Sequence, residues 1–129
     1  MIVVDTNILA YLYLPGEFTA QAEALLRKEP EWAAPMLWRS EFRNILAGYL
    51  RRNAFDLRHA IAVQREAEAL LAQGEHIVDS EAVLELVGRS DCSAYDCEFV
   101  ALAQGLGVKL ATMDAKLIKA FPRIATPLA

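Results

Sequence analysis

The sequence predicts an α/β fold, a three-layer sandwich in which helices cover both faces of a central, mainly parallel sheet. Short, unbroken apolar runs support this class, above all "IVV" at 2–4, because parallel strands are buried on both faces. Longer segments between these runs place apolar residues at helical spacing. Strands and helices alternate along the chain, which favours parallel pairing through helical crossovers.

The N-terminal half is expected to alternate short strands with amphipathic helices. Pro35 lies near the end of the second strand, the helix that follows carries one apolar stripe, and we expect Gly74 to stop the next helix. The elements expected here are, in order, a strand at 2–4, helices around 6–13 and 18–28, a strand at 32–36, and helices at 37–52 and 55–74.

The C-terminal half continues the alternation. Asp79 or Ser80 opens one helix, a glycine ends the next, and Pro122 stops the last. The expected elements are a strand at 76–78, helices at 80–90 and 92–107, a strand at 108–112, a helix at 114–121 and an edge strand at 124–126. Because no repeat, low-complexity tract or linker interrupts the pattern, we expect residues 1–129 to form a single domain.

The composition indicates a folded, non-membrane protein. At 129 residues and 55% hydrophobic, the chain can bury a substantial core. No apolar run approaches the roughly 18 to 20 residues that span a bilayer, and Asp5 interrupts any signal-peptide core. Cys92 and Cys97 form neither a CxxC pair nor a repeating pattern, so we expect reduced thiols and a cytoplasmic location.

The net charge of −4 argues against binding of nucleic acid by bulk electrostatics. Arginines are nevertheless concentrated in the second quarter of the chain and just beyond it. Two interpretations remain open, a solvated helical face and an edge that contacts phosphates. The arginines concerned are Arg39, Arg43, Arg51, Arg52, Arg58 and Arg65.

Four acidic residues occupy positions where a parallel α/β fold can gather them. Asp5 and Asp114 each follow a strand and precede a helix, Asp96 lies at a helix start, and Glu41 lies at the rim of an apolar stripe. Ligands bind at the carboxyl ends of parallel strands, near the switch in strand order. Each acid also has a structural interpretation: Asp5 and Asp114 as helix caps, Asp96 in a capping box with Ser93, and Glu41 as a snorkelling or salt-bridged side chain.

Several carboxylates at one rim repel one another unless a cation is present. Magnesium and manganese prefer oxygen ligands, and such a metal can activate water or clamp a phosphate oxygen during phosphodiester cleavage. The two histidines, His59 and His76, lie in no motif and are not needed for this chemistry.

Three segments, "MIVVDTNILAYL", "SEFRNIL" and "CSAYDCEFVALAQGLGVKLATMDAKL", resemble the PIN-domain family. Within it they are similar to the VapC-type toxins of type II toxin–antitoxin pairs, and the resemblance runs from end to end. It implies a PIN-like α/β/α sandwich and a metal-dependent endoribonuclease that cleaves RNA with metal-activated water.

The resemblance also assigns roles to residues. The family's four acids fall on Asp5, Glu41, Asp96 and Asp114, which are expected to be both catalytic and metal-binding. The first three would hold Mg²⁺ or Mn²⁺, with Asp114 as an outer or second-metal ligand. Cys97 departs from the pattern, since an alanine usually follows the third acid. The supporting polar residues fall on Thr6, Asn7, Ser93 and Thr112.

VapC-like toxins meet RNA through a local basic rim, for which Arg39 and Arg43 are the candidates here. The resemblance implies an RNA substrate, a cognate antitoxin whose C-terminal segment wraps the toxin, and a homodimer. Two other functions remain open. One is a phosphohydrolase with an aspartyl-phosphate, although Asn7 stands where such enzymes commonly carry a second aspartate. The other is a non-catalytic module that binds a partner.

Overall fold

The computed structural model describes all residues from Met1 to Ala129, and its centre is a five-stranded parallel sheet. The strands are β1 (Ile2–Val4), β2 (Trp32–Pro35), β3 (Glu75–His76), β4 (Leu110–Ala111) and β5 (Ala125–Thr126). The helices are α1 (Thr6–Tyr13), α2 (Thr19–Lys28), α3 (Leu37–Arg51), α4 (Leu57–Leu70), α5 (Ser80–Gly88), α6 (Ala94–Leu106) and α7 (Ala115–Ala120). None of these helices is long and apolar enough to cross a membrane.

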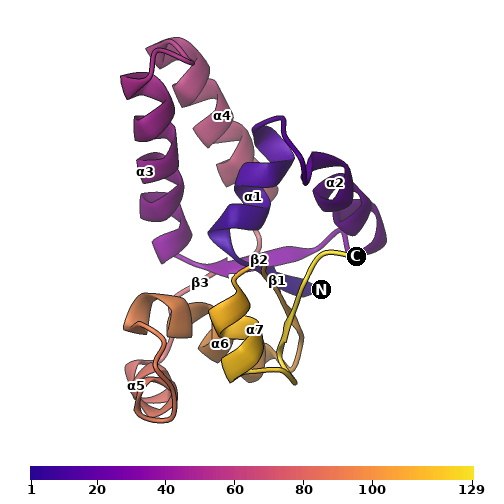
Figure 1. Ribbon diagram of the computed structural model, residues 1–129, viewed down its shortest axis with the longest axis vertical. Coiled ribbons are helices and arrows are strands. Elements are labelled where there is room, and N and C mark those ends of the chain that lie inside the picture. The colour runs from indigo at the N-terminus through magenta and orange to yellow at the C-terminus, as the bar shows by residue number, and fades with distance from the viewer.

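The helices form two layers, one on each face of the sheet. Figure 1 shows α1 to α4 on one side of the strands and α5, α6 and α7 on the other. Helices α1 and α3 contact the first face, and α6 contacts β1, β2 and β4 from the second. The expected three-layer sandwich is therefore confirmed.

The strand order, β3-β2-β1-β4-β5, contains one reversal of direction. From β1 the chain moves outward through β2 to β3, and then returns to place β4 on the free side of β1. In register, Val3 pairs with Ala33 on one side and with Leu110 on the other. The carboxyl ends of β1 and β4 thus meet at the point where strand order reverses, which is the usual place for a ligand in an open parallel sheet.

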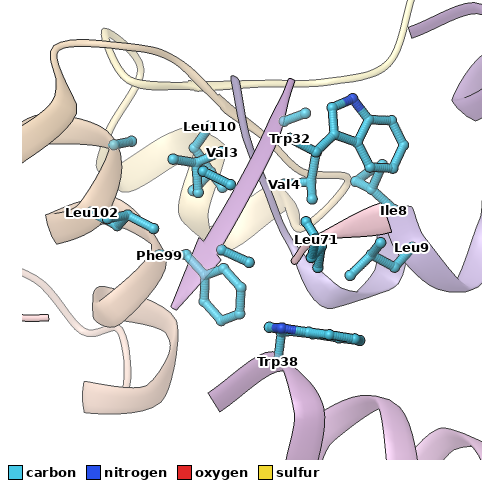
Figure 2. Close-up of a cluster of buried hydrophobic side chains, with 14 of the residues drawn as sticks. Val3, Val4, Ile8, Leu9, Trp32, Trp38, Leu71, Phe99, Leu102 and Leu110 are labelled. Atoms are coloured by element: carbon cyan, nitrogen blue, oxygen red, sulfur yellow. The ribbon is translucent and has the colours of Figure 1, made fainter. Parts of the chain in front are cut away.

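β1 is completely surrounded by apolar side chains, as its unbroken β-branched sequence predicts. Val3 and Val4 are fully buried. Because successive side chains of a strand point to opposite faces, Val3 packs on the side of Phe99, whereas Val4 lies on the side of Ile8 and Leu9 (Figure 2). Burying a valine side chain stabilises a fold by roughly 1.5 kcal/mol or more. Asp5, the residue that follows β1, is therefore held in place by the buried core.

The helix expected at 55–74 is shorter, and Gly74 does not stop it. Asp56 caps α4, which ends at Leu70, four residues before the glycine. Gly74 instead lies against β2, where its carbonyl accepts a hydrogen bond from the Ala34 N–H at 2.9 Å. A Cβ atom at this position would lie 2.1 Å from the carbonyl oxygen of Trp32. The close approach of two backbones, rather than a helix end, requires glycine here.

The other elements appear where the pattern predicts them, with small differences at their ends. The strand expected at 76–78 is found at Glu75–His76, since Ile77 lies beyond the sheet and is 93% exposed. The strand expected at 108–112 pairs only at Leu110–Ala111. The last strand lies at the sheet edge, as expected. Gly107, with φ of +68°, ends α6 in the left-handed conformation that favours glycine.

Candidate active site

Asp5 lies at the carboxyl end of β1 and both of its carboxylate oxygens accept hydrogen bonds. Oδ1 accepts from the backbone N–H of Thr6 at 2.8 Å, so the expected capping role at α1 is confirmed. Oδ2 accepts from the hydroxyl of Thr112 at 2.7 Å, a residue 107 positions away in the sequence. Asp5 is only 8% exposed. A cap alone does not account for the second bond, which holds the carboxylate at the reversal of strand order.

Thr112 connects the loops that follow β1 and β4. Its side chain is completely buried, its hydroxyl donates to Asp5, and the same oxygen accepts from the backbone N–H of Asp114 at 3.0 Å. Asp114 in turn caps α7 by accepting from the N–H of Lys116 at 2.9 Å. One buried hydroxyl thus fixes the relative positions of two of the four acidic residues.

Glu41 is held by a threonine rather than by an arginine. The Thr6 hydroxyl donates to Oε1 of Glu41 at 2.7 Å, which joins α1 to α3. Glu41 forms no ion pair, since the chain's ion pairs involve only the N-terminus with Glu29 and Arg39 with two other glutamates. The salt-bridge interpretation of Glu41 is therefore wrong. Its half-buried carboxylate stays without a cationic partner.

Asp96 lies in the first turn of α6, behind an N-cap that forms as expected. The Ser93 hydroxyl accepts from the N–H of Asp96 at 3.1 Å. In a complete capping box the side chain of the fourth residue returns a bond to the backbone N–H of the first. No such bond forms here, so the backbone does not use the Asp96 carboxylate.

The acidic residues influence one another although they come from four different segments. Burial raises the pKa of Asp5, and the charges of Asp96 and Asp114 raise it further, against the hydrogen bonds from two threonine groups. Burial, followed by the charges of Asp5 and Asp96, raises the pKa of Glu41 against the Thr6 hydrogen bond. Burial and Asp114 raise the pKa of Asp96. Three raised values indicate that ionising the whole cluster is unfavourable without a counter-ion.

The donor set fits a hard divalent cation. Carboxylate and hydroxyl oxygens are the ligand types that Mg²⁺ and Mn²⁺ prefer, and none of the four carboxylates forms an ion pair within the chain. The side chains do not form a preformed metal site, because no group of three His, Cys, Asp or Glu residues surrounds one point. The structure therefore gathers the carboxylates at one edge without closing them around a single position.

Three of the other expected site residues are placed differently from the acids. Asn7 is exposed and its side chain makes no hydrogen bond. Arg39 donates from Nε and Nη2 to Glu75 at 2.6 and 2.7 Å and also pairs with Glu68. Arg43 is exposed and donates only to the hydroxyl of Ser40. Of the two arginines predicted to contact RNA, Arg43 is the one with its charge free.

Two residues near the site were missed in the sequence. The charge of Glu98 contributes to the raised pKa of Glu41, and Lys116 opposes the raised pKa of Asp96. The sequence signal for both is their position, since Glu98 lies two residues after Asp96 and Lys116 lies two residues after Asp114.

Comparison with known proteins places the fold. A family model described as the PIN domain matches residues 2–124. The chain is 29% identical over 139 residues to the protein named Ribonuclease VapC3 from Pyrobaculum aerophilum, with 98% of each chain covered.

Solved structures of similar fold cover nearly the whole chain. FitAcB from Neisseria gonorrhoeae has a TM-score of 0.76 at 16% identity, covering 97% of this chain and 96% of that chain. VapC20 from Mycobacterium tuberculosis, described as a sarcin–ricin loop cleaving toxin, has a TM-score of 0.68 at 21% identity, covering 93% and 95%. Because the family model extends over nearly the whole chain, this protein belongs to the PIN domain family.

Proposed function

We propose that this chain is a metal-dependent endoribonuclease and the toxin of a toxin–antitoxin pair. The observation that carries the proposal is the convergence of Asp5, Glu41, Asp96 and Asp114 on the carboxyl ends of β1 and β4, where burial and neighbouring carboxylates raise the pKa of Asp5, Glu41 and Asp96. The names of the relatives support it, since one is called a ribonuclease and another a cleaving toxin.

Within this proposal Asp5, Glu41 and Asp96 hold Mg²⁺ or Mn²⁺, and Asp114 serves as an outer or second-metal ligand. When bound, such a cation lowers the pKa of water and neutralises charge on a phosphate oxygen. The chain's own contribution is to keep the carboxylates oriented and ionised. Thr112 and Thr6 each direct one hydroxyl proton at a carboxylate, which favours its charged form despite burial.

The remaining residues support this arrangement. Ser93 caps α6, so that the first turn carrying Asp96 keeps its conformation. An RNA strand approaching the cluster must be attracted from outside it, because the carboxylates themselves repel phosphates. Arg43 is the predicted contact that is free to supply this attraction.

A non-catalytic module would use the acids only as helix caps, and Asp96→Asn separates the two functions. Asparagine supplies a neutral carbonyl in place of a charge, so we expect loss of metal-dependent RNA cleavage. Metal-free stability should be unchanged or slightly raised, because the repulsion between Asp96 and the other acids is removed. The assay is cleavage of single-stranded RNA with Mg²⁺ or with chelator, beside thermal unfolding of the same samples.

Asp56→Asn is the matched control, because Asp56 caps α4 through the N–H of His59 far from the cluster. It should cleave RNA like the unmodified protein. Wild-type cleavage by purified Asp96→Asn protein would refute the metal site and the nuclease activity built on it.

We further propose that the chain works as one domain in the cytoplasm, where RNA is its substrate. In the same proposal it forms a homodimer and binds a cognate antitoxin. Exposed apolar side chains near β3 and α5, Met36, Ile77 and Leu84, support a protein contact. A structural neighbour is described as a toxin–antitoxin complex from Klebsiella pneumoniae, with a TM-score of 0.70 at 18% identity over 98% of this chain and 97% of that chain. Light scattering of the purified protein tests the dimer directly.

A further inference from the structure

A hollow next to the carboxylate cluster gathers unpaired positive charge. Its volume is about 420 Å³. Arg89, which follows α5, and Lys116 and Lys119 of α7 line it, with Asp91 as the only carboxylate. Helices α5 and α7 lie on the same side of the sheet (Figure 1). Three cations around one hollow contrast with the net charge of −4 of the whole chain.

The three cations are available to a ligand. Arg89, Lys116 and Lys119 are exposed, and none of them forms an ion pair or a side-chain hydrogen bond within the chain. Ser90, which also lines the hollow, donates its hydroxyl to the carbonyl of Leu86 at 2.8 Å. Unpaired cations that line one hollow suit an anion such as a phosphate group.

The hollow adjoins the acidic site on two sides. On one side, its wall at Cys92 leads directly to Ser93, the cap of the helix that carries Asp96. On the other, Lys116 donates its backbone N–H to the carboxylate of Asp114. A polyanion that enters the acidic site on the α7 side therefore has a cation, Lys116, two residues from Asp114.

The predicted basic rim on α3 is less suited to this task. Arg39 is already bound to Glu75 and Glu68, which leaves Arg43 as the free cation near the start of that helix. Phosphate contacts position a nucleic acid and supply most of its non-specific affinity. The hollow between the end of α5 and α7 offers three cations for such a contact in one place.

We propose that the hollow of Arg89, Lys116 and Lys119 binds a backbone phosphate of single-stranded RNA, next to the phosphodiester bond at the acidic site. The assignment of RNA as the ligand rests on the proposed ribonuclease function. The hollow attracts the strand that the carboxylates repel, and thereby sets the direction in which the RNA leaves the cluster.

The test compares two double variants in a non-cleaving Asp96→Asn background. Lys116→Gln/Lys119→Gln removes two cations from the hollow. Arg27→Gln/Lys28→Gln removes two exposed cations from the end of α2, on the opposite layer. Binding of a fluorescent single-stranded RNA is measured by anisotropy over a range of salt concentrations, and thermal unfolding confirms that all variants are folded.

Removal of the two lysines should weaken binding about tenfold and reduce the slope of log affinity against log salt by up to about 0.7, which is the contribution of one phosphate neutralised on a single strand. The control pair should change affinity less than about twofold. Equal effects of the two pairs, or an unchanged slope, would overturn the proposal. So would competition by poly-glutamate as strong as that by RNA, because the hollow would then favour an acidic protein segment equally.

Cleavage by the unmodified protein is measured separately, so the two proposals fail independently. If RNA is cleaved but the lysines leave the slope unchanged, the hollow is wrongly assigned and the nuclease stands. If no RNA is cleaved with metal while the lysines still carry salt-dependent binding, the nuclease fails and the phosphate site stands.

Discussion

Replacement of Thr112 by valine tests how the structure holds Asp5. Valine has nearly the shape of threonine, so the completely buried position stays filled. The substitution removes the donor to Oδ2 of Asp5 and the acceptor for the N–H of Asp114, whose distances are 2.7 and 3.0 Å. Every other contact of the loop remains, and the loss therefore reports on these two hydrogen bonds.

The size of the effect follows from the two bonds. A hydrogen bond to a charged group contributes about 1.5 to 3 kcal/mol, and a neutral one about 1 kcal/mol. We expect Thr112→Val to lower the free energy of unfolding by about 3 kcal/mol at neutral pH. Because burial already raises the pKa of Asp5 and the Thr112 bond opposes this, the variant's Asp5 pKa lies higher still. The loss is complete above that raised pKa and shrinks as pH falls through it, where Asp5 becomes protonated.

Urea unfolding followed by tryptophan fluorescence, in the presence of chelator, measures both the loss and its pH dependence. Thr126→Val is the matched control. Thr126 lies on the neighbouring strand β5, and its hydroxyl makes no hydrogen bond, so its replacement should change stability by less than about 0.5 kcal/mol. If Thr112→Val is no more destabilising than Thr126→Val, or if its effect is the same at neutral and acidic pH, the assigned role of the hydroxyl is incorrect.

Three further predictions concern the scaffold around the site. Hydrogen bonds from Arg39 lower the pKa of Glu75, so its contribution to stability is present above the ordinary carboxylate pKa and is lost as pH falls through the lowered one. Glu75→Gln should therefore lower the free energy of unfolding by about 1 to 3 kcal/mol at neutral pH and by much less at acidic pH. Urea unfolding at neutral and at acidic pH measures the two losses. Equal losses at the two pH values would contradict the ion pair. Gly74→Ala should lower the free energy of unfolding by more than about 2 kcal/mol, because the new Cβ meets the carbonyl oxygen of Trp32. Gly105 lies at an open helical position, so Gly105→Ala should raise the free energy of unfolding by up to about 1 kcal/mol. Thermal unfolding of both variants measures the difference. Similar effects of the two alanines would refute the close approach at Gly74. Ser93→Ala should cost about 1 kcal/mol and reduce cleavage only in part; complete loss of activity at unchanged stability would show that the serine is more than a cap.

The fold could be predicted because its strands and helices carry strong periodic signals. An unbroken β-branched run such as that at 2–4 fits only a strand buried on both faces, and alternation with helices then implies a parallel sheet. Gly74 shows where this reasoning ends. A glycine after a helical pattern has two possible causes, a helix cap and a close backbone approach. Only the position of β2 in space distinguishes them.

The candidate site was predictable in its residues but not in its bonds. Parallel topology brings strand ends to one edge, so Asp5 and Asp114 could be placed together from their positions after strands. The bond between Thr112 and Asp5 joins residues 107 positions apart, and no local pattern indicates it. The same holds for Arg39, whose partner Glu75 lies 36 positions away. An arginine two residues from Glu41 therefore looked like a ligand contact, although it mainly joins α3 to β3.

The two threonines and a divalent cation act on the same protonation equilibria. A protonated carboxylate is a poor metal ligand, and burial together with mutual repulsion favours protonation of Asp5, Glu41 and Asp96. Thr112 and Thr6 each oppose this at one carboxylate with a single hydrogen bond, so they reduce the number of protons that a cation must displace. Asp96 has no such threonine donor, and its raised pKa is opposed instead by a hydrogen bond with Ser93 and by the charge of Lys116. Loss of either threonine hydroxyl should therefore weaken cation binding, because the cation must then displace more protons.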